Sequence, residues 1–140
     1  MDPRPTLSQR LRYLLSVPFI YGMLLPLLLF HLVLELYHRI CFPLYGIRTV
    51  RARDYFVIDR HKVQGLECMQ RLQCAYCGYG NGLMAYAREI IARTEAFWCP
   101  MQHRKTPEGT HPRHDDYCPY GDAEGFPLLR KRLQDKLKQA

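Results

Sequence analysis

"LLSVPFIYGMLLPLLLFHLVL", residues 14–34, decides the fold because it contains no Asp, Glu, Lys or Arg. A stretch of about 21 residues lets an α-helix cross a hydrocarbon core of roughly 30 Å. A buried helix of a soluble protein would instead need a large surrounding core, which the rest of this 140-residue chain is too short to supply. The sequence therefore predicts a membrane anchor over residues 1–45.

Two prolines interrupt this run and predict a kink. Pro18 and Pro26 each lack a backbone donor and disfavour helical geometry at the preceding residue. Basic residues flank both ends of the run, so the positive-inside rule gives no steep contrast. Either one helix crosses the bilayer and leaves the C-terminal part in the cytoplasm, or the chain bends near Pro26 and returns. We expect the crossing helix, since a bent backbone in lipid needs a protein partner for its polar groups.

Polar residues mark the end of the run. His31, Glu35 and His38 are spaced one helical turn apart and share one face. Polar side chains at such a depth are candidate functional groups by default. We interpret them as an interfacial polar cluster or as a stripe that faces a partner.

The following region, residues 46–125, predicts a small helical domain. Helical periodicity covers residues 60–73 and residues 81–98, and the glycine-rich stretch "CAYCGYGNG", residues 74–82, lies between them as a turn. Two helices joined by a short turn should form an antiparallel hairpin. Residues 101–125 are rich in His, Pro, Gly and Asp, and predict a loop that is ordered only if other contacts hold it.

The tail, residues 126–140, predicts a basic amphipathic helix. Such a helix suits an anionic lipid surface, and it also suits an acidic protein partner. The predicted fold class is therefore mainly α, with a kinked membrane helix, a cytoplasmic helical hairpin, a His/Cys-containing loop and this tail helix. The apolar stripe is Phe126, Leu129, Leu133 and Leu137, and the candidate lipid-surface residues are Arg130, Lys131, Arg132, Lys136 and Lys138.

The six cysteines favour ligands, redox groups or buried thiols over disulfides, because no signal-peptide cleavage site follows the apolar run. Read along the chain, Cys74, Cys77, Cys99 and His103 form C-x2-C-x21-C-x3-H, which is a plausible zinc or iron ligand set. The helix predicted between the two halves separates them by about 24 Å, too far for one ion.

The ligands therefore divide into two candidate sites. The pair Cys74 and Cys77, placed just before a helix, is also the setting of a redox-active C-x-x-C. Zinc or iron is the expected metal, an iron–sulfur cluster less so, and the alternative is that the cysteines pack and the histidines are solvated. One site comprises Cys68, Cys74 and Cys77, and the other comprises Cys99, His103 and His61, joined by His111, His114 and Cys118 with Asp115 or Asp116 as supporting groups.

Several motifs are spread over residues 41–125, which is most of the chain: "CFPLYGI", "DRHK", "CAYCGYGNGLMAYAREIIARTEAFWCPMQH" and "YGDAEG". With them the chain resembles a family of short bacterial inner-membrane proteins that carry a C-x-x-C-G-Y turn and a W-C-P-x-x-H motif. The resemblance implies a membrane-anchored bacterial protein, and it assigns neither an activity nor a ligand.

These features predict a small inner-membrane protein whose cytoplasmic part carries a Cys/His metal or redox site and belongs to a larger membrane assembly. The alternative is a metal-free accessory subunit that uses the kinked helix and the basic tail as contact surfaces. An enzyme ranks third, because the chain has no nucleophile elbow, phosphate loop or triad. Sequence-specific nucleic-acid binding ranks last, because the basic residues behind the +7 charge are dispersed.

Overall fold

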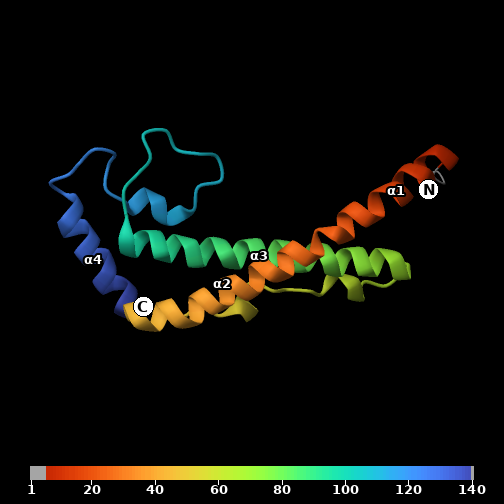
Figure 1. Ribbon diagram of the computed structural model, residues 1–140, viewed down its shortest axis with the longest axis horizontal. Helices are drawn as coiled ribbons and strands as arrows, with labels where there is room; N and C mark the ends of the chain where they lie inside the picture. The colour runs from red at the N-terminus through yellow and green to blue at the C-terminus, as the bar shows by residue number, and fades with distance from the viewer. Residues whose placement is uncertain (1–5, 140) are drawn as a thin grey trace. The chain divides into compact units, whose positions relative to one another are not determined.

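The computed structural model describes residues 6–139, except for the side chain of His61. The mainly α fold class is confirmed: the described residues contain no β-strand, only an isolated parallel bridge between Met101 and Cys118. The chain divides into two compact units, one up to Leu36 and one from Tyr37 onward, and each is described by itself. In chain order the elements are α1 (Leu7–Gly22), α2 (Leu24–Tyr45), η1 (Ala52–Asp54), η2 (Arg60–Lys62), α3 (Cys68–Trp98), η3 (Pro112–Asp116) and α4 (Phe126–Gln139), where η denotes a 3-10 helix (Figure 1).

The first unit contains α1 and the start of α2. The backbone N–H of Thr6 donates to Oε1 of Gln9 at 2.8 Å and caps α1. The two helices are separated at Met23, three residues before Pro26, whose missing N–H leaves the carbonyl of Gly22 without a helical donor. Met23 keeps helical dihedral angles, and the chain runs on from α1 into α2 without reversing (Figure 1). The interruption lies near the predicted kink, and the chain does not reverse near Pro26.

The apolar helix formed by α1 and α2 is long enough to cross a membrane. It covers Leu7–Tyr45, which is 39 residues, and meets this test by length and composition. Its end is set by Gly46, whose φ of +70° favours glycine. The N–H of Gly46 donates to the carbonyl of Pro43 at 3.0 Å, and the N–H of Ile47 donates to that of Phe42 at 2.9 Å. The loop that leaves the helix therefore starts at Gly46, although residues 41–50, with Pro43 and Gly46, read in the sequence as an exit loop.

The predicted hairpin is wrong, because α3 is one unbroken helix of 31 residues. At 1.5 Å per residue it is about 46 Å long. It begins after Glu67, whose N–H donates to Oε1 of Gln70 at 2.9 Å. Asn81, at the start of the second predicted helix, lies inside α3, and its Nδ2 donates to the carbonyl of Cys77 at 2.9 Å.

The glycines of the expected turn serve a close helix contact instead. Gly78 and Gly82 lie four residues apart on one face of α3, and the segment from Tyr55 to Ile58 runs against that face. This segment has no regular secondary structure and forms no strand. A side chain at Gly82 would collide with the backbone of Tyr55 and Phe56. The glycines therefore let the segment from Tyr55 to Ile58 pack closely on α3 while the helix stays unbroken.

The core of the second unit lies between the end of α2, the chain that follows it and the middle of α3. Phe42 of α2 is fully buried, as is Tyr86 of α3. The hydroxyl of Thr94 donates to the carbonyl of Ile90 at 2.9 Å, so the hydroxyl of Tyr37 is the donor in its 2.8 Å bond to Thr94. Other buried apolar residues are Ile47, Val50, Leu83, Ala87, Ile90, Ala92 and Ala96.

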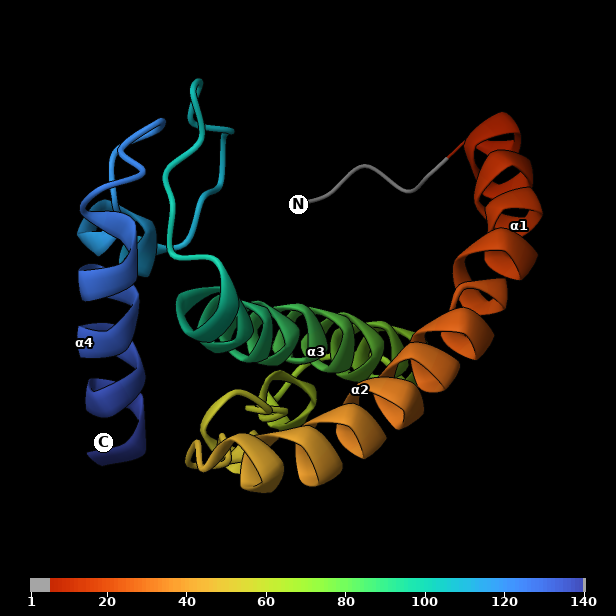
Figure 2. The same cartoon turned by 60° about the vertical axis from the view of Figure 1, so that its left-hand side comes forward.

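Residues 101–125 form an ordered loop over the C-terminal half of α3, and η3 lies within it (Figures 1 and 2). The N–H of Gln102 donates to the carbonyl of Cys118 at 2.7 Å, and the N–H of Cys118 donates to that of Pro100 at 2.9 Å. These two bonds close the loop at its base. The guanidinium of Arg88 on α3 donates to the carbonyl of Thr110 at 2.7 Å and holds the far side.

Candidate functional site

His38 is a buried core residue rather than part of an exposed stripe. Its side chain is 2% exposed. The backbone N–H of Val50 donates to its Nε2 at 2.8 Å, and its Nδ1 lies 3.0 Å from the hydroxyl of Tyr86. Because Nε2 accepts a bond from a backbone N–H, the ring is neutral and Nδ1 carries the proton that goes to Tyr86. His38 thereby joins α2, the chain after it and α3.

His31 and Glu35 lie in the first unit, four residues apart on α2, and both are half-buried. They share one helix face as the spacing predicts. His38 follows one turn later, but its hydrogen bonds belong to the second unit. Of the three, His38 is buried, and the predicted polar cluster stays a prediction.

The dithiol lies inside α3, not before it. Cys74 and Cys77 are the seventh and tenth residues of the helix, one turn apart on one face, so the setting of a dithiol before a helix N-terminus is absent. Cys77 is exposed and Cys74 is half-buried, and both thiols are free. Side chains one turn apart on a helix have Cβ atoms about 5–6 Å apart, farther than a disulfide allows, so this pair does not close without local unwinding. Cys68 is exposed at the first position of α3, two turns away.

The ligands predicted at the other end are only partly brought together. Cys99 is exposed just after α3, about 33 Å from Cys77 along the helix. The ring of His103 stacks on that of His114, with centroids 5.5 Å apart. His114 is 3% exposed, and its Nε2 accepts the backbone N–H of His103 at 3.2 Å. That nitrogen is therefore used in folding the loop, while the side chain of His61 lies outside the described residues.

His111 binds a carboxylate of α3. Its Nε2 lies 2.8 Å from Oε2 of Glu95, and this bond places the proton on Nε2. Its Nδ1 is buried and has no hydrogen-bond partner among the described residues. The ring also lies edge-on to His114, with centroids 6.3 Å apart. His111 thus docks the loop on α3 by one nitrogen only.

Glu89 is the electrostatic centre of the loop contact. One oxygen, Oε1, accepts from Nε of Arg93 at 2.8 Å and from the guanidinium of Arg113 at 2.7 Å. Burial by itself raises the pKa of Glu89, but the hydrogen bonds and charges of the two arginines outweigh it, so the pKa lies below its ordinary value. The bond to Arg93 is the i,i+4 pair that the sequence indicates, whereas no sequence signal indicates Arg113.

Cys118 is a buried thiol that is hydrogen-bonded within the fold. The thiol is 2% exposed and donates to Oδ2 of Asp122 at 3.5 Å. Burial, followed by this bond, raises the pKa of the Cys118 thiol, which disfavours the thiolate that binds metals. The N–H of Gly125 donates to Oδ1 of Asp122 at 2.9 Å and, with the Cys118 bond, lowers the pKa of that carboxyl. The contact fixes the turn that leads into α4.

The tail forms α4 with the predicted apolar stripe, and Leu137 in that stripe is buried. Arg130 is turned inward: its Nε donates to the carbonyl of Phe97 at 3.3 Å, and Gln134 donates to the same carbonyl at 2.8 Å. The remaining predicted lipid-surface residues, Lys131, Arg132, Lys136 and Lys138, are exposed.

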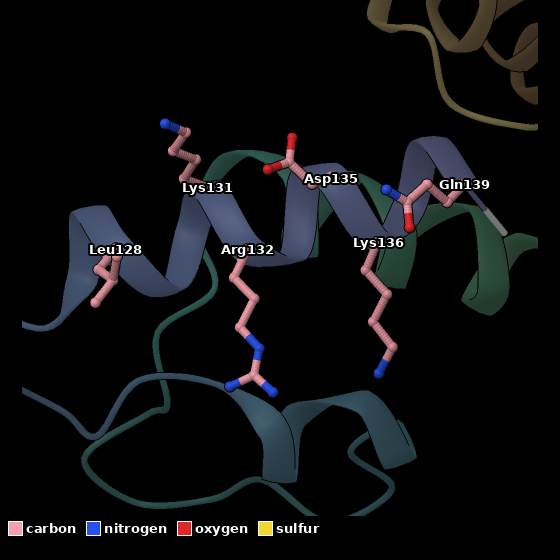
Figure 3. Close-up of a pocket in the computed structure, with 6 residues that line it drawn as sticks. All are labelled: Leu128, Lys131, Arg132, Asp135, Lys136 and Gln139. Atoms are coloured by element: carbon pink, nitrogen blue, oxygen red, sulfur yellow. The ribbon is translucent and has the colours of Figure 1, made fainter.

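The basic face of α4 is hollowed toward the loop. Arg132 and Lys136 point toward η3, whereas Lys131 and Asp135 project away from it (Figure 3). A hollow of about 210 Å³ lies between α4 and Asp116 of η3. A second, more open hollow of about 500 Å³ is lined by residues of α4 alone. The carboxylate of Asp116 partly offsets the positive charge there.

Aromatic side chains gather where α2 and α3 end. The ring of Tyr45 stacks on that of Phe97 with centroids 5.2 Å apart, and it meets Trp98 edge-on at 5.4 Å. The guanidinium carbon of Arg130 lies 5.6 Å from the centroid of the Trp98 ring. Sequence reasoning missed this cluster, because its members come from distant parts of the chain.

Among the described residues, no three His, Cys, Asp or Glu side chains are arranged to hold a metal ion. Comparison with known proteins gave no match to any family model, curated protein or solved structure. The family resemblance of the motifs stays a prediction.

Proposed function

We propose that this protein is a membrane-anchored accessory subunit of a larger bacterial inner-membrane assembly. The supporting observation is that three of the candidate ligands of the folded unit are committed to its own structure. The imidazoles of His38 and His114 accept backbone N–H groups, and the thiol of Cys118 donates to Asp122. The surfaces offered outward are the apolar helix Leu7–Tyr45 and the basic side of α4.

The basic side of α4 is the proposed contact with anionic lipid on the cytoplasmic side. Each basic residue close to an anionic leaflet adds about 1 kcal/mol of attraction. Lys131, Arg132, Lys136 and Lys138 are all exposed, which leaves their charges available.

Extraction from native membranes in a mild detergent tests the assembly role. We expect the chain to migrate in a complex well above the mass of one chain. A double variant, Lys131→Glu with Lys138→Glu, should weaken that complex or its binding to anionic vesicles, whereas Lys105→Glu with Arg104→Glu makes the same charge change in the exposed loop and should not. A chain recovered entirely as a monomer would overturn the proposal.

A membrane-impermeant thiol reagent tests the cytoplasmic side. Cys77 and Cys99 are exposed. We expect both to be protected in intact spheroplasts and labelled in inverted vesicles, and the opposite pattern would place the folded unit outside.

A metal or redox site at Cys74 and Cys77 is the second candidate. The observation that favours it is that both thiols are free and share one helix face, so they offer two ligands. A partner in the assembly would supply the others. Zinc or iron bound to the intact assembly in a fixed ratio, and lost with Cys77→Ser but not with Cys68→Ser, supports this candidate; equal metal content in both variants contradicts it.

A further inference from the structure

The folded unit carries exposed apolar residues in two regular rows. On α3, Met84, Ile91 and Trp98 are 48%, 55% and 47% exposed. They recur every seven residues and so lie along one stripe of the helix. On α2, Ile40 and Leu44 are 50% and 76% exposed and lie one turn apart. We call these five residues the apolar face.

Contacts between the two helices bring the rows together. Tyr45, next to Leu44, packs edge-on against Trp98 with centroids 5.4 Å apart. One turn back along α3, Thr94 accepts a hydrogen bond from Tyr37 at 2.8 Å. The exposed row of α3 therefore borders α2, and the two rows meet at the Tyr45–Trp98 contact.

We propose that the apolar face lies in the lipid interface of an anionic bilayer, so that the folded unit rests on the membrane as well as being tethered to it. The inference rests on the proposed membrane anchoring. Lipid is the chosen occupant because Ile40 and Leu44 belong to the same continuous helix as the membrane run. The Leu7–Tyr45 helix, at 39 residues, is about 58 Å long, against roughly 30 Å of hydrocarbon, so part of its apolar surface extends past the core. Interfacial helices bury such surface about 5–10 Å into the boundary between headgroups and acyl chains.

The composition around Trp98 fits that layer. Tyr and Trp side chains concentrate at the headgroup level, where one end of the ring is apolar and the other is hydrated. The guanidinium of Arg130 lies over the Trp98 ring, with its Nε bonded to the carbonyl of Phe97, and so places a positive charge beside the face. The exposed Arg39 and Arg48 of the same unit add positive charge on either side of Leu44 in the chain.

Trp98 is the single tryptophan of the chain, so its fluorescence reports on this face alone. The full chain is reconstituted into vesicles of phosphatidylcholine and phosphatidylglycerol, with lipids brominated at defined depths. We expect the Trp98 emission to be shifted to shorter wavelength. Bromines near the headgroup should quench it most and bromines at the end of the acyl chain should quench it less. Iodide dissolved in the aqueous phase should quench it little. Ile91→Gln should reduce the quenching, whereas Val57→Gln, which changes an exposed apolar residue outside the face, should not.

Two other outcomes overturn the proposal. Emission that iodide quenches and bromolipid does not would place Trp98 in water. Emission that resists both quenchers and changes when the protein is diluted in lipid would mean that a second copy covers the face. Flotation of the same vesicles separates this inference from the anchoring: a chain that fails to float refutes the anchoring, whereas a floating chain with a water-exposed Trp98 refutes only the lipid contact.

Discussion

Gly82 and Tyr55 approach so closely that a Cβ at Gly82 would lie 2.8 Å from the carbonyl oxygen of Tyr55. The same Cβ would be 3.2 Å from the Cα of Phe56. Both obstacles are backbone atoms, which cannot rotate away as a side chain can. Residue 82 must therefore lack a side chain if the chain after α2 is to pack on α3.

The first prediction is that Gly82→Ala destabilises the second unit, because the added methyl group must push the segment around Tyr55 away from α3. A loss of about 1–3 kcal/mol in the free energy of unfolding is expected from overpacking. Gly80→Ala is the matched control, since a Cβ there meets nothing within 4 Å and alanine favours the helix by up to about 1 kcal/mol. Chemical denaturation in detergent, followed by circular dichroism, measures both. Equal stability of the two variants would contradict the close contact.

These glycines also show where sequence reasoning fails. Three glycines within five residues are typical of a turn, and that interpretation led to the hairpin. The same spacing also places Gly78 and Gly82 on one helix face, where they make room for a neighbour. The neighbour is the segment from Tyr55 to Ile58, and nothing in the local pattern of residues 74–82 indicates it. By contrast, the apolar run and the tail helix were predictable, because their periodicity is carried by residues close in the chain.

The second prediction concerns His38. His38→Leu keeps most of the side-chain volume but leaves the N–H of Val50 and the hydroxyl of Tyr86 without this acceptor and donor. A stranded buried polar group costs about 1–3 kcal/mol, and we expect a loss of that order in thermal or denaturant unfolding. Tyr86→Phe should cost less, because the bond from Val50 to His38 remains. A His38→Leu variant as stable as the parent would show that the bond contributes nothing net.

The third prediction is a pH dependence centred on Glu89. Because the pKa of Glu89 is lower in the folded state than in the unfolded state, its contribution to stability is complete above the unfolded pKa. That contribution is lost as the pH falls through the folded pKa, when the carboxylate is protonated and its bonds to Arg93 and Arg113 weaken. Glu89→Gln should therefore lower stability at neutral pH, by about 1–2 kcal/mol, and flatten the acid decline. Glu108→Gln, at an exposed site in the loop, should reproduce the parent curve, and an unchanged acid limb in Glu89→Gln would refute the assignment.

The fourth prediction ranks the thiols. Cys68, Cys77 and Cys99 are exposed, whereas Cys118 is buried and its thiol has a raised pKa. Alkylation of the native chain followed by mass spectrometry should modify the three exposed cysteines first and Cys118 last. Asp122→Ala should speed the reaction of Cys118, because it removes a hydrogen-bond acceptor that holds the thiol. Rapid labelling of Cys118 in the native parent would contradict the described packing.

The residues of the candidate site could be named from the sequence, but most of their contacts could not. The pair of Glu89 with Arg93 follows from the sequence alone, because the two residues lie one turn apart on one helix face. The density of histidines in residues 103–114 indicated metal ligands, but hydrogen bonds over long separations decide their roles. The partner of His114 is a backbone N–H, and that of His111 is Glu95, sixteen residues earlier in the chain. Such pairings depend on how the loop folds back, which spacing alone does not specify.

The docking of the loop on α3 has a consequence for the order of folding during synthesis. Its anchors on α3 (Arg88, Glu89, Ala92 and Glu95) precede their loop partners by 16 to 25 residues. The helix therefore leaves the ribosome before the segment that needs it, and the loop meets a template already in place. Closing such a short span costs little chain entropy. The bond between Tyr37 and Thr94 spans 57 residues. Because contacts between distant parts of a chain form more slowly than local ones, we expect the packing of α2 on α3 to be slower than the docking of the loop.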